Sequence, residues 1–237
     1  METTPAKLEK LMASCQHDIW GFVIYRSAYG PDSDTDFFAL IRHLKDLVAE
    51  CDEDYGNQPI FQRLTWTMFD DRNTLENATN AQIKKTFSEW CCSDSAISEQ
   101  PNWLHPVSQS PLARYQFCLH IDQASLDSFS TATSKSSASK SLATAFVNIV
   151  ARRFPQDISE EYLDDPGDDA DDEFEDDGLY SPIEGNHEPD VGWCKLPIDQ
   201  IYLGAYVELC HNETWFRLYV RPPALVGSRH GLSYDGF

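Results

Sequence analysis

Apolar and polar residues alternate most regularly between residues 115 and 121. Four large apolar side chains point to one side of an extended chain here, and Gln116, Cys118 and His120 point to the other. This pattern predicts a β-strand with its apolar face on a core, because a slip of one residue would expose all four apolar groups. Runs of aromatic and β-branched residues predict further strands at 20–25, 64–69, 145–150, 191–196 and 214–220.

Apolar residues recur at helical spacing in two other segments. Residues 37–48 carry them at i, i+3, i+4 and i+7, after a stretch rich in Asp that offers helix N-caps. From Asn80 onward, Ile83, Phe87 and Trp90 fall on one helical face. Residues 91–113 are rich in Ser and Pro, and we expect them to form a loop.

The order strand, helix, strand, helix, strand, followed by more strands, predicts an α+β fold. We expect a single mixed or antiparallel sheet with helices on one face, either ferredoxin-like or a related α/β sandwich. One domain is predicted at 18–226. It is flanked by a flexible N-terminal tail at 1–17 and a C-terminal tail at 227–237, and it carries an acidic disordered insertion at about 157–190.

The predicted insertion holds the densest charge in the chain. Thirteen of the 21 residues from Asp157 to Asp177 are Asp or Glu, and none is Lys or Arg. Like charges repel, and the segment has little apolar area to bury, so it should be extended and solvated. Two roles stay open for it: a solubilising loop, or a surface that binds a basic partner.

The overall composition argues against some partners and compartments. A formal net charge of −21 disfavours binding to nucleic acid or to an anionic membrane surface, since both need clustered Lys and Arg. The sequence has neither a signal-peptide pattern nor an apolar run of about 18 residues, so we expect a cytoplasmic protein. Its seven cysteines are odd in number and lack the spacing of a disulfide framework, which predicts free thiols.

Common cofactor and catalytic motifs are absent from the sequence. It has no phosphate-binding glycine-rich loop, dinucleotide fingerprint, G-x-S-x-G elbow or H-E-x-x-H helix. Cys91 and Cys92 are adjacent and therefore do not form a C-x-x-C site, and the seven histidines are not paired at metal-ligand spacing. We therefore expect no cofactor and no metal ion.

Polar residues on the faces of the predicted strands supply the candidate site. If these faces converge, they combine an imidazole, a phenol, an amide and guanidinium groups, a set suited to acid–base work or to holding a carbonyl-rich ligand. The catalytic candidates are His120, Tyr25 and Arg217, and the substrate-binding candidates are Arg26, Asn148, Tyr219 and Arg221. The alternative is a polar sheet face that simply meets water.

Short motifs are spread along most of the chain. They are Trp20-Gly-Phe-Val-Ile-Tyr-Arg26, Asp71-Arg72, Phe87-Ser-Glu-Trp90, Arg114-Tyr-Gln-Phe-Cys118, Val191-Gly-Trp193 and Tyr219-Val-Arg-Pro-Pro223. As a set, spanning about residues 18–223, they resemble a large family of uncharacterised proteins of filamentous fungi with a variable acidic segment before the Gly-Trp. The resemblance implies an intracellular fungal protein and brings no catalytic residues with it.

Two functions of different kinds remain in view. The first is a cofactor-independent enzyme, of the isomerase or cyclase type, acting on an apolar small molecule of fungal secondary metabolism. It is suggested by the aromatic content and by the missing cofactor motifs. The second is a non-enzymatic interaction protein whose acidic loop at 157–177 binds a basic partner. A pocket lined by His120, Tyr25 or Arg217 together with aromatic residues would favour the enzyme.

Overall fold

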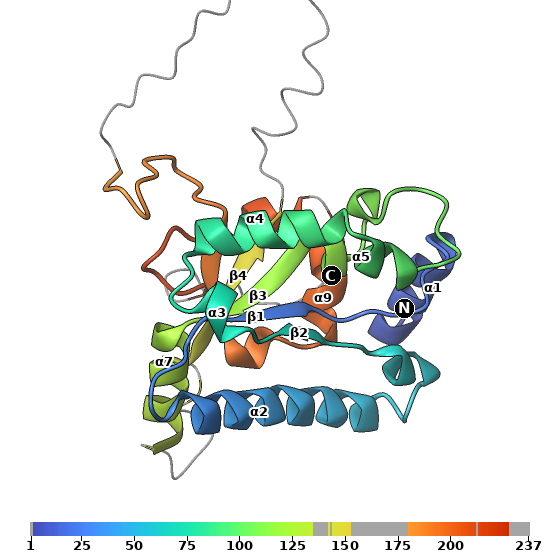
Figure 1. Cartoon of the computed structure of the whole chain (residues 1–237). Coiled ribbons are helices and arrows are strands. Elements are labelled where there is room, and N and C mark those ends of the chain that lie inside the picture. Colours follow the sequence, from blue (N-terminus) through green and yellow to red (C-terminus); the bar gives the residue numbers. More distant parts are fainter. Residues whose placement is uncertain (1, 135–141, 143, 153–179, 212, 228–237) are drawn as a thin grey trace, which may run out of the picture.

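A sheet of five strands forms the centre of the protein (Figure 1). The structure is a computed structural model that describes residues 2–134, 142, 144–152, 180–211 and 213–227. In spatial order, the strands are β2 (Thr67–Phe69), β1 (Val23–Arg26), β3 (Phe117–Ile121), β4 (Phe146–Ala151) and β5 (Trp193–Pro197). β1 runs parallel to β2 and β3, whereas β4 runs antiparallel to β3 and β5. The predicted α+β fold with a single mixed sheet is confirmed.

Helices cover both faces of this sheet. α2 (Ser33–Asp54) and α7 (Gln123–Ser134) lie on one face, and α4 (Asn80–Cys91) lies on the other (Figure 1). We expected helices on one face only, because alternation such as that in β3 usually means that one face meets water. Instead, all five residues of β3 are buried, and His120 is hydrogen-bonded to the first residue of α4. Of the two predicted variants, the α/β sandwich describes this arrangement.

Both predicted helices bury the stripes that their spacing defines. The buried apolar residues are Phe37, Leu40, Ile41, Leu44 and Val48 in α2 and Ile83, Phe87 and Trp90 in α4. Thr79 and Gln82 form a capping box that satisfies free N–H groups at the start of α4. Burial of each large apolar side chain stabilises a fold by roughly 1.5–3 kcal/mol. These two stripes therefore fix the helices on opposite faces of the sheet.

The N-terminal segment that we expected to be a flexible tail is part of the packed structure. Residues Thr4–Ser14 form α1, which packs on α9 (Leu203–Leu209). Leu8 and Met12, one helical turn apart, are both 0% exposed. Removing α1 would therefore uncover apolar surface of α9.

The other short elements lie mainly in the connections. They are η1 (Pro59–Arg63), α3 (Arg72–Leu75), α5 (Asp94–Ser98), η2 (Val107–Gln109), α6 (Ala113–Gln116), η4 (Ile198–Gln200) and α10 (Thr214–Leu218). The strand predicted at 214–220 is wrong, because this segment begins with α10. Trp215 and Leu218 are its buried residues, and their i, i+3 spacing is helical. The predicted loop at 91–113 also contains α5 and η2.

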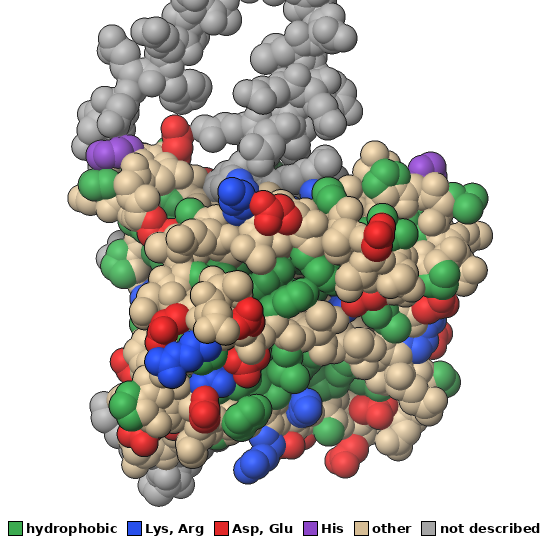
Figure 2. Space-filling view, viewed as in Figure 1, with side chains coloured by type: hydrophobic (Ala, Val, Ile, Leu, Met, Phe, Trp, Pro, Cys, Tyr) green, Lys and Arg blue, Asp and Glu red, His purple; other side chains and the backbone are tan. Residues whose placement is uncertain are grey.

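An apolar area reaches the surface where β2 forms the edge of the sheet. Figure 2, in the view of Figure 1, shows green side chains gathered between α4 and α2 at this edge. Met68, the central residue of β2, is 46% exposed. The edge strand has only three residues, and short edge strands limit pairing with other chains.

Three further expectations meet the structure only in part. Within the described residues, no helix combines the length and apolar character needed to cross a bilayer. All seven cysteines are unpaired, and five of them are buried. The acidic run at 157–177 lies outside the described residues. The end of the predicted insertion, residues 180–190, is described and includes a bridge between Ile183 and Asn186.

Candidate functional site at the carboxyl ends of the strands

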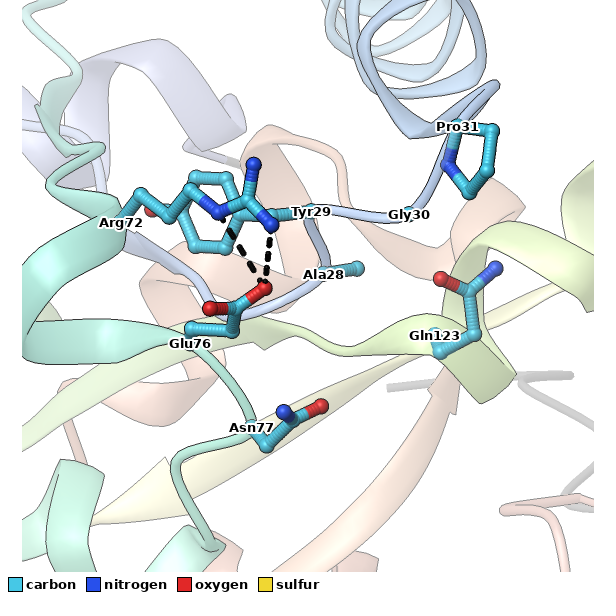
Figure 3. Close-up of a pocket in the computed structure, with 8 residues that line it drawn as sticks. All are labelled: Ala28, Tyr29, Gly30, Pro31, Arg72, Glu76, Asn77 and Gln123. Atoms are coloured by element: carbon cyan, nitrogen blue, oxygen red, sulfur yellow. Dashed lines mark hydrogen bonds and ion pairs between the residues drawn. The ribbon is translucent and has the colours of Figure 1, made fainter.

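The carboxyl ends of the parallel strands β1, β2 and β3 meet at one edge of the sheet. The chain leaves β1 toward α2 on one face and leaves β2 toward α4 on the other (Figure 1). In α/β sheets, ligands bind outside the carboxyl ends of strands whose connections diverge in this way. Here the connections enclose an open crevice of about 430 Å³. We call it the carboxyl-edge crevice; its lining residues are Ala28, Tyr29, Gly30, Pro31, Arg72, Glu76, Asn77 and Gln123 (Figure 3).

Polar side chains make up part of the crevice lining, opposite the largely apolar segment from Ala28 to Pro31. Arg72 on α3 donates from Nε and Nη2 to Oε1 of Glu76, at 3.2 and 2.8 Å (Figure 3). The side-chain amides of Asn77 and Gln123 come from two different connections, and each carries both donors and an acceptor. The crevice therefore offers a ligand several hydrogen-bonding groups beside an apolar wall.

The turn at Asn77 closes the crevice against the end of β1. Asn77 has φ of 58°, a left-handed conformation that Asn tolerates better than most residues. Its N–H donates to the carbonyl of Ser27 at 3.0 Å, and the N–H of Ser27 donates to the carbonyl of Ile121 at 3.0 Å. Ser27 thus joins β3 to the turn that carries Asn77.

A chain of buried polar side chains starts at Ser27. Its Oγ lies 2.7 Å from Nε2 of His120, and Nδ1 of His120 lies 2.8 Å from Oδ1 of Asn80. Asn80 in turn donates from Nδ2 to Oε1 of Glu184 at 3.2 Å. Ser27, His120 and Asn80 are each at most 4% exposed. Three elements that are distant in sequence, β1, β3 and α4, are tied together by this chain.

Glu184 fixes the direction of every hydrogen bond in the chain. Its carboxylate accepts only, so the amide nitrogen of Asn80 faces Glu184 and the amide oxygen faces His120. Nδ1 of His120 must then carry the proton, and Nε2 is left to accept from the hydroxyl of Ser27. Burial lowers the pKa of His120 to about 4, against the opposing effect of the Asp122 and Glu184 carboxylates. The ring is therefore a neutral base at neutral pH.

Two more predicted site residues lie beside His120. Tyr25 and Asn148 are its register partners on β1 and β4, so the three side chains share one face of the sheet. The Tyr25 ring stacks on Phe69 at 4.9 Å, and its hydroxyl has no hydrogen-bond partner among the described residues. Burial raises the pKa of Tyr25 far above its usual value. Asn148 donates from Nδ2 to Oδ2 of Asp122 at 2.9 Å.

Arg26 ends β1 and clamps the loop that follows. It is 2% exposed and donates to the carbonyl of Ala28 at 2.8 Å and to Oγ of Ser33 at 3.0 Å. It also pairs with the carboxylates of Asp34 and Asp70. Its hydrogen-bonding capacity is thus used to hold one wall of the crevice.

The three C-terminal candidates lie outside this site. Arg217 on α10 is exposed and pairs with Glu213 at 3.4 Å. Tyr219 accepts from the N–H of Val191 at 3.0 Å, and Arg221 donates to the carbonyl of Ser181 at 2.8 Å. The predicted convergence depended on a strand at 214–220, which the chain does not form. Tyr219 and Arg221 instead hold the segment before β5.

Several residues of the crevice and its floor were not candidates from the sequence. They are Ser27, Arg72, Glu76, Asn77, Asn80, Gln123 and Glu184. A usable signal exists for two of them, because Ser27 and Gln123 each come two residues after a predicted strand. No known family model, curated protein or solved structure matches the chain. The function is therefore inferred from the geometry of this edge of the sheet.

Proposed function

We propose that this protein is a cofactor-independent enzyme that binds a small polar molecule in the carboxyl-edge crevice. The observation that carries the proposal is the position of the crevice, where the connections after β1 and β2 diverge, next to the Ser27–His120–Asn80 chain. A neutral imidazole and oriented amides are sufficient for acid–base catalysis without a cofactor. Isomerase and cyclase reactions are compatible with such a site.

The polar side chains of the crevice support a substrate with hydrogen-bonding groups, in addition to the apolar part suggested by the sequence. Asn77 and Gln123 offer amide groups, and Arg72 with Glu76 offers a charged pair. The aromatic side chains near His120 lie in the core: Tyr25 and Phe87 are each 0% exposed. They are better placed to stabilise the sheet than to contact a ligand.

A binding screen with matched variants tests the proposal. Hydroxy, keto and amide metabolites would be screened against the full chain by thermal shift, and hits confirmed by calorimetry. Asn77→Gly keeps the left-handed backbone and removes the amide; Asn57→Gly does the same at φ of 55°, away from the crevice. We expect Asn77→Gly to weaken a ligand by about tenfold or more, and Asn57→Gly to leave it unchanged. Equal binding by both variants, or no ligand at all, would contradict the proposal.

An interaction function is the second candidate. The thirteen acidic residues between Asp157 and Asp177 support a basic protein partner. A chain with these residues changed to Asn and Gln should lose such a partner in pull-downs at low salt, where exposed charges act over a Debye length of roughly 10 Å or more. Deletion of 164–177 should leave the melting temperature within a few degrees of the full chain. A partner retained by the neutralised chain would rule this candidate out.

Membership of the fungal family and a cytoplasmic location also remain proposals, together with a role in secondary metabolism. The short motifs support the first, and seven unpaired cysteines support a reducing compartment. Thiol counting after denaturation without reductant should return seven thiols per chain. Five or fewer would contradict the proposed location.

A further inference from the structure

We propose that Ser27 is a nucleophile, that His120 is its general base, and that the substrate is a small ester or related acyl compound. This inference rests on the proposed function of the carboxyl-edge crevice and names its reaction. It is based on the hydrogen bond from the Ser27 hydroxyl to Nε2 of His120. Asn80 and Glu184 fix the tautomer of His120 that leaves Nε2 unprotonated.

The arrangement provides what an activated serine requires. A nucleophilic serine needs a base within hydrogen-bond reach and a third group that orients the base. The Oγ–Nε2 distance is 2.7 Å, and Asn80 orients the ring through Nδ1 at 2.8 Å. An amide at the third position is unfavourable when it donates to the histidine, because the proton then sits on the wrong nitrogen. Here Glu184 engages the Asn80 nitrogen, so the amide oxygen faces the ring.

Glu184 also supplies negative charge to the chain. Its carboxylate is one amide group away from the ring and acts to raise the pKa of His120. An imidazolium that forms when Ser27 attacks is stabilised by such a charge. In this series of hydrogen-bonded side chains, Asn80 therefore orients the His120 ring, and the Glu184 carboxylate compensates the positive charge that forms on it.

The crevice gives the hydroxyl a route to a substrate. Ala28 follows Ser27 directly and lines the crevice, and Asn77 lines it while donating its N–H to the Ser27 carbonyl. Ser27 is 3% exposed and does not itself line the crevice, so an acyl compound reaches Oγ only after the structure around Ser27 opens, for example by a shift of the Asn77 turn that is bonded to the Ser27 carbonyl. Substrates with a small acyl group should consequently react fastest.

The reaction proceeds in two balanced steps. Oγ of Ser27 attacks the carbonyl carbon, its proton moves to Nε2 of His120, and the electron pair of the C=O bond moves to oxygen. As the tetrahedral intermediate collapses, the bond to the leaving oxygen breaks and Nε2–H gives that oxygen the proton. Water then attacks the acyl-serine with the same proton transfers, releasing the acid and free Ser27. The side-chain amides of Asn77 and Gln123 line the crevice and are the proposed donors to the oxyanion; Gln123 also donates to Asp127 at 2.8 Å, which leaves one of its two N–H groups for this role.

The chain contains its own control for this proposal. Oγ of Ser110 lies 2.8 Å from Nε2 of His17, and both residues are buried. No side chain hydrogen-bonds to Nδ1 of His17 among the described residues, and neither residue is adjacent in sequence to a residue that lines the crevice, as Ser27 is to Ala28. A reagent that merely finds buried serines next to histidines should not distinguish the two pairs.

The test uses the full chain and a small alkyl fluorophosphonate, which loses fluoride to an activated serine. Intact-mass spectrometry should show one adduct, and peptide mapping should place it on Ser27. Ser27→Ala and His120→Gln should slow labelling by about a hundredfold or more, and Ser110→Ala should label at the wild-type rate. Hydrolysis of p-nitrophenyl acetate should follow the same order.

Mapping on the wild-type chain decides the matter even if a variant fails to fold. An adduct on Ser110 or elsewhere, or no adduct, would overturn the nucleophile. If Asn77→Gly still weakens ligand binding while Asn57→Gly does not, the proposed function stands and only the acyl chemistry is lost. If both experiments fail, the crevice is not a site.

Discussion

The described part of the chain contains two buried serine–histidine pairs, one at each end of the parallel strands. Ser27 and His120 lie 2.7 Å apart at the carboxyl ends, and Ser110 and His17 lie 2.8 Å apart before the amino ends. Burial lowers the pKa of each histidine to about 4. By contact distance, burial and charge the two pairs are alike, so none of these properties alone marks a site.

Their surroundings differ. His120 has its proton fixed by Asn80, and its partner Ser27 directly precedes Ala28, which lines the crevice; the His17 ring instead packs edge-on against Trp103 and Tyr115 at 5.0 and 5.8 Å. Ser110 also accepts from the N–H of Leu112 at 3.2 Å, which ties its hydroxyl to the loop before α6. A candidate site is therefore distinguished from a structural contact less by the serine–histidine pair itself than by the side chain that holds Nδ1 of the histidine and by a crevice nearby.

The amino-end pair belongs to a larger network centred on Arg114. This guanidinium is 0% exposed, pairs with Glu99 at 2.7 Å, and donates to the carbonyls of Gly21 and Thr65 at 3.0 and 2.8 Å. Burial acts to lower the pKa of Arg114, but its contacts with Glu99 outweigh that effect and raise it. We therefore expect the residues at the amino ends of the parallel strands to stabilise the fold, and those at the carboxyl ends to form the catalytic site.

The largest expected effect comes from Arg114→Met. Glu99 would keep a mostly buried charge without its partner, and such losses cost about 3–5 kcal/mol of unfolding free energy. Arg26→Met, at the carboxyl end, should cost less, because Asp34 and Asp70 are 76% and 36% exposed and regain water. Urea unfolding measures both variants. An equal or larger loss of unfolding free energy for Arg26→Met would contradict the view that the amino ends of the parallel strands contribute most to stability.

The two histidines should contribute equally to the loss of unfolding free energy at acidic pH. Each has a folded-state pKa of about 4 and an unfolded value of 6.5, so the unfolded chain takes up the proton first as the pH falls. Each histidine therefore contributes stability that is complete above pH 6.5 and lost toward pH 4, by about 3 kcal/mol at that pH. The unfolding free energy should fall less steeply between pH 6.5 and 4 in His120→Gln than in the wild type. The reduction in slope should be about half of that in the double variant His120→Gln/His17→Gln. A pH dependence unchanged by either substitution would mean that these rings are not buried in neutral form.

Part of this picture could be predicted from the sequence. The helical stripes at 37–48 and 83–90 are long enough to reveal their period, and the alternation at 117–121 places His120 opposite Leu119 and Ile121. All three inferences depend on residues close together in the chain. The helix at Thr214–Leu218 was missed because a run of aromatic residues favours a strand, and one helical turn is too short to show its period.

The floor of the site could not be predicted in the same way. Ser27, Asn80 and Glu184 reach His120 from three separate segments, and Asn80 is 40 residues away from it. Nothing in local spacing indicates that the start of one helix will lie over a particular position of a strand. Long-range contacts of this kind depend on strand order, which the sequence pattern left open between mixed and antiparallel sheets.

Asn80→Ala makes the carboxyl-edge pair resemble the amino-end pair. It removes the side chain that holds Nδ1 of His120, so we expect slower labelling of Ser27 by about tenfold or more and a loss of about 1–3 kcal/mol in unfolding free energy. Asn73→Ala, on the exposed surface of α3, is the control and should change neither. Labelling that persists at the wild-type rate in folded Asn80→Ala would show that the third group is dispensable.

The smallest effect concerns two buried tyrosines, one in each region. The hydroxyl of Tyr115 donates to Glu99 at 3.1 Å and accepts from Gln100 at 3.0 Å. Tyr115→Phe removes both hydrogen bonds, but Glu99 keeps its bond from Arg114 and Gln100 keeps its bond to Ile19, so the change should cost about 0.5–1.5 kcal/mol. The hydroxyl of Tyr25 has no partner among the described residues, so Tyr25→Phe removes an unsatisfied group. Its unfolding free energy should be unchanged or about 1 kcal/mol higher. Because this hydroxyl also makes no hydrogen bond to His120, labelling of Ser27 should continue at the wild-type rate. A stable Tyr25→Phe variant that no longer labels would return Tyr25 to the catalytic role that the sequence suggested for it.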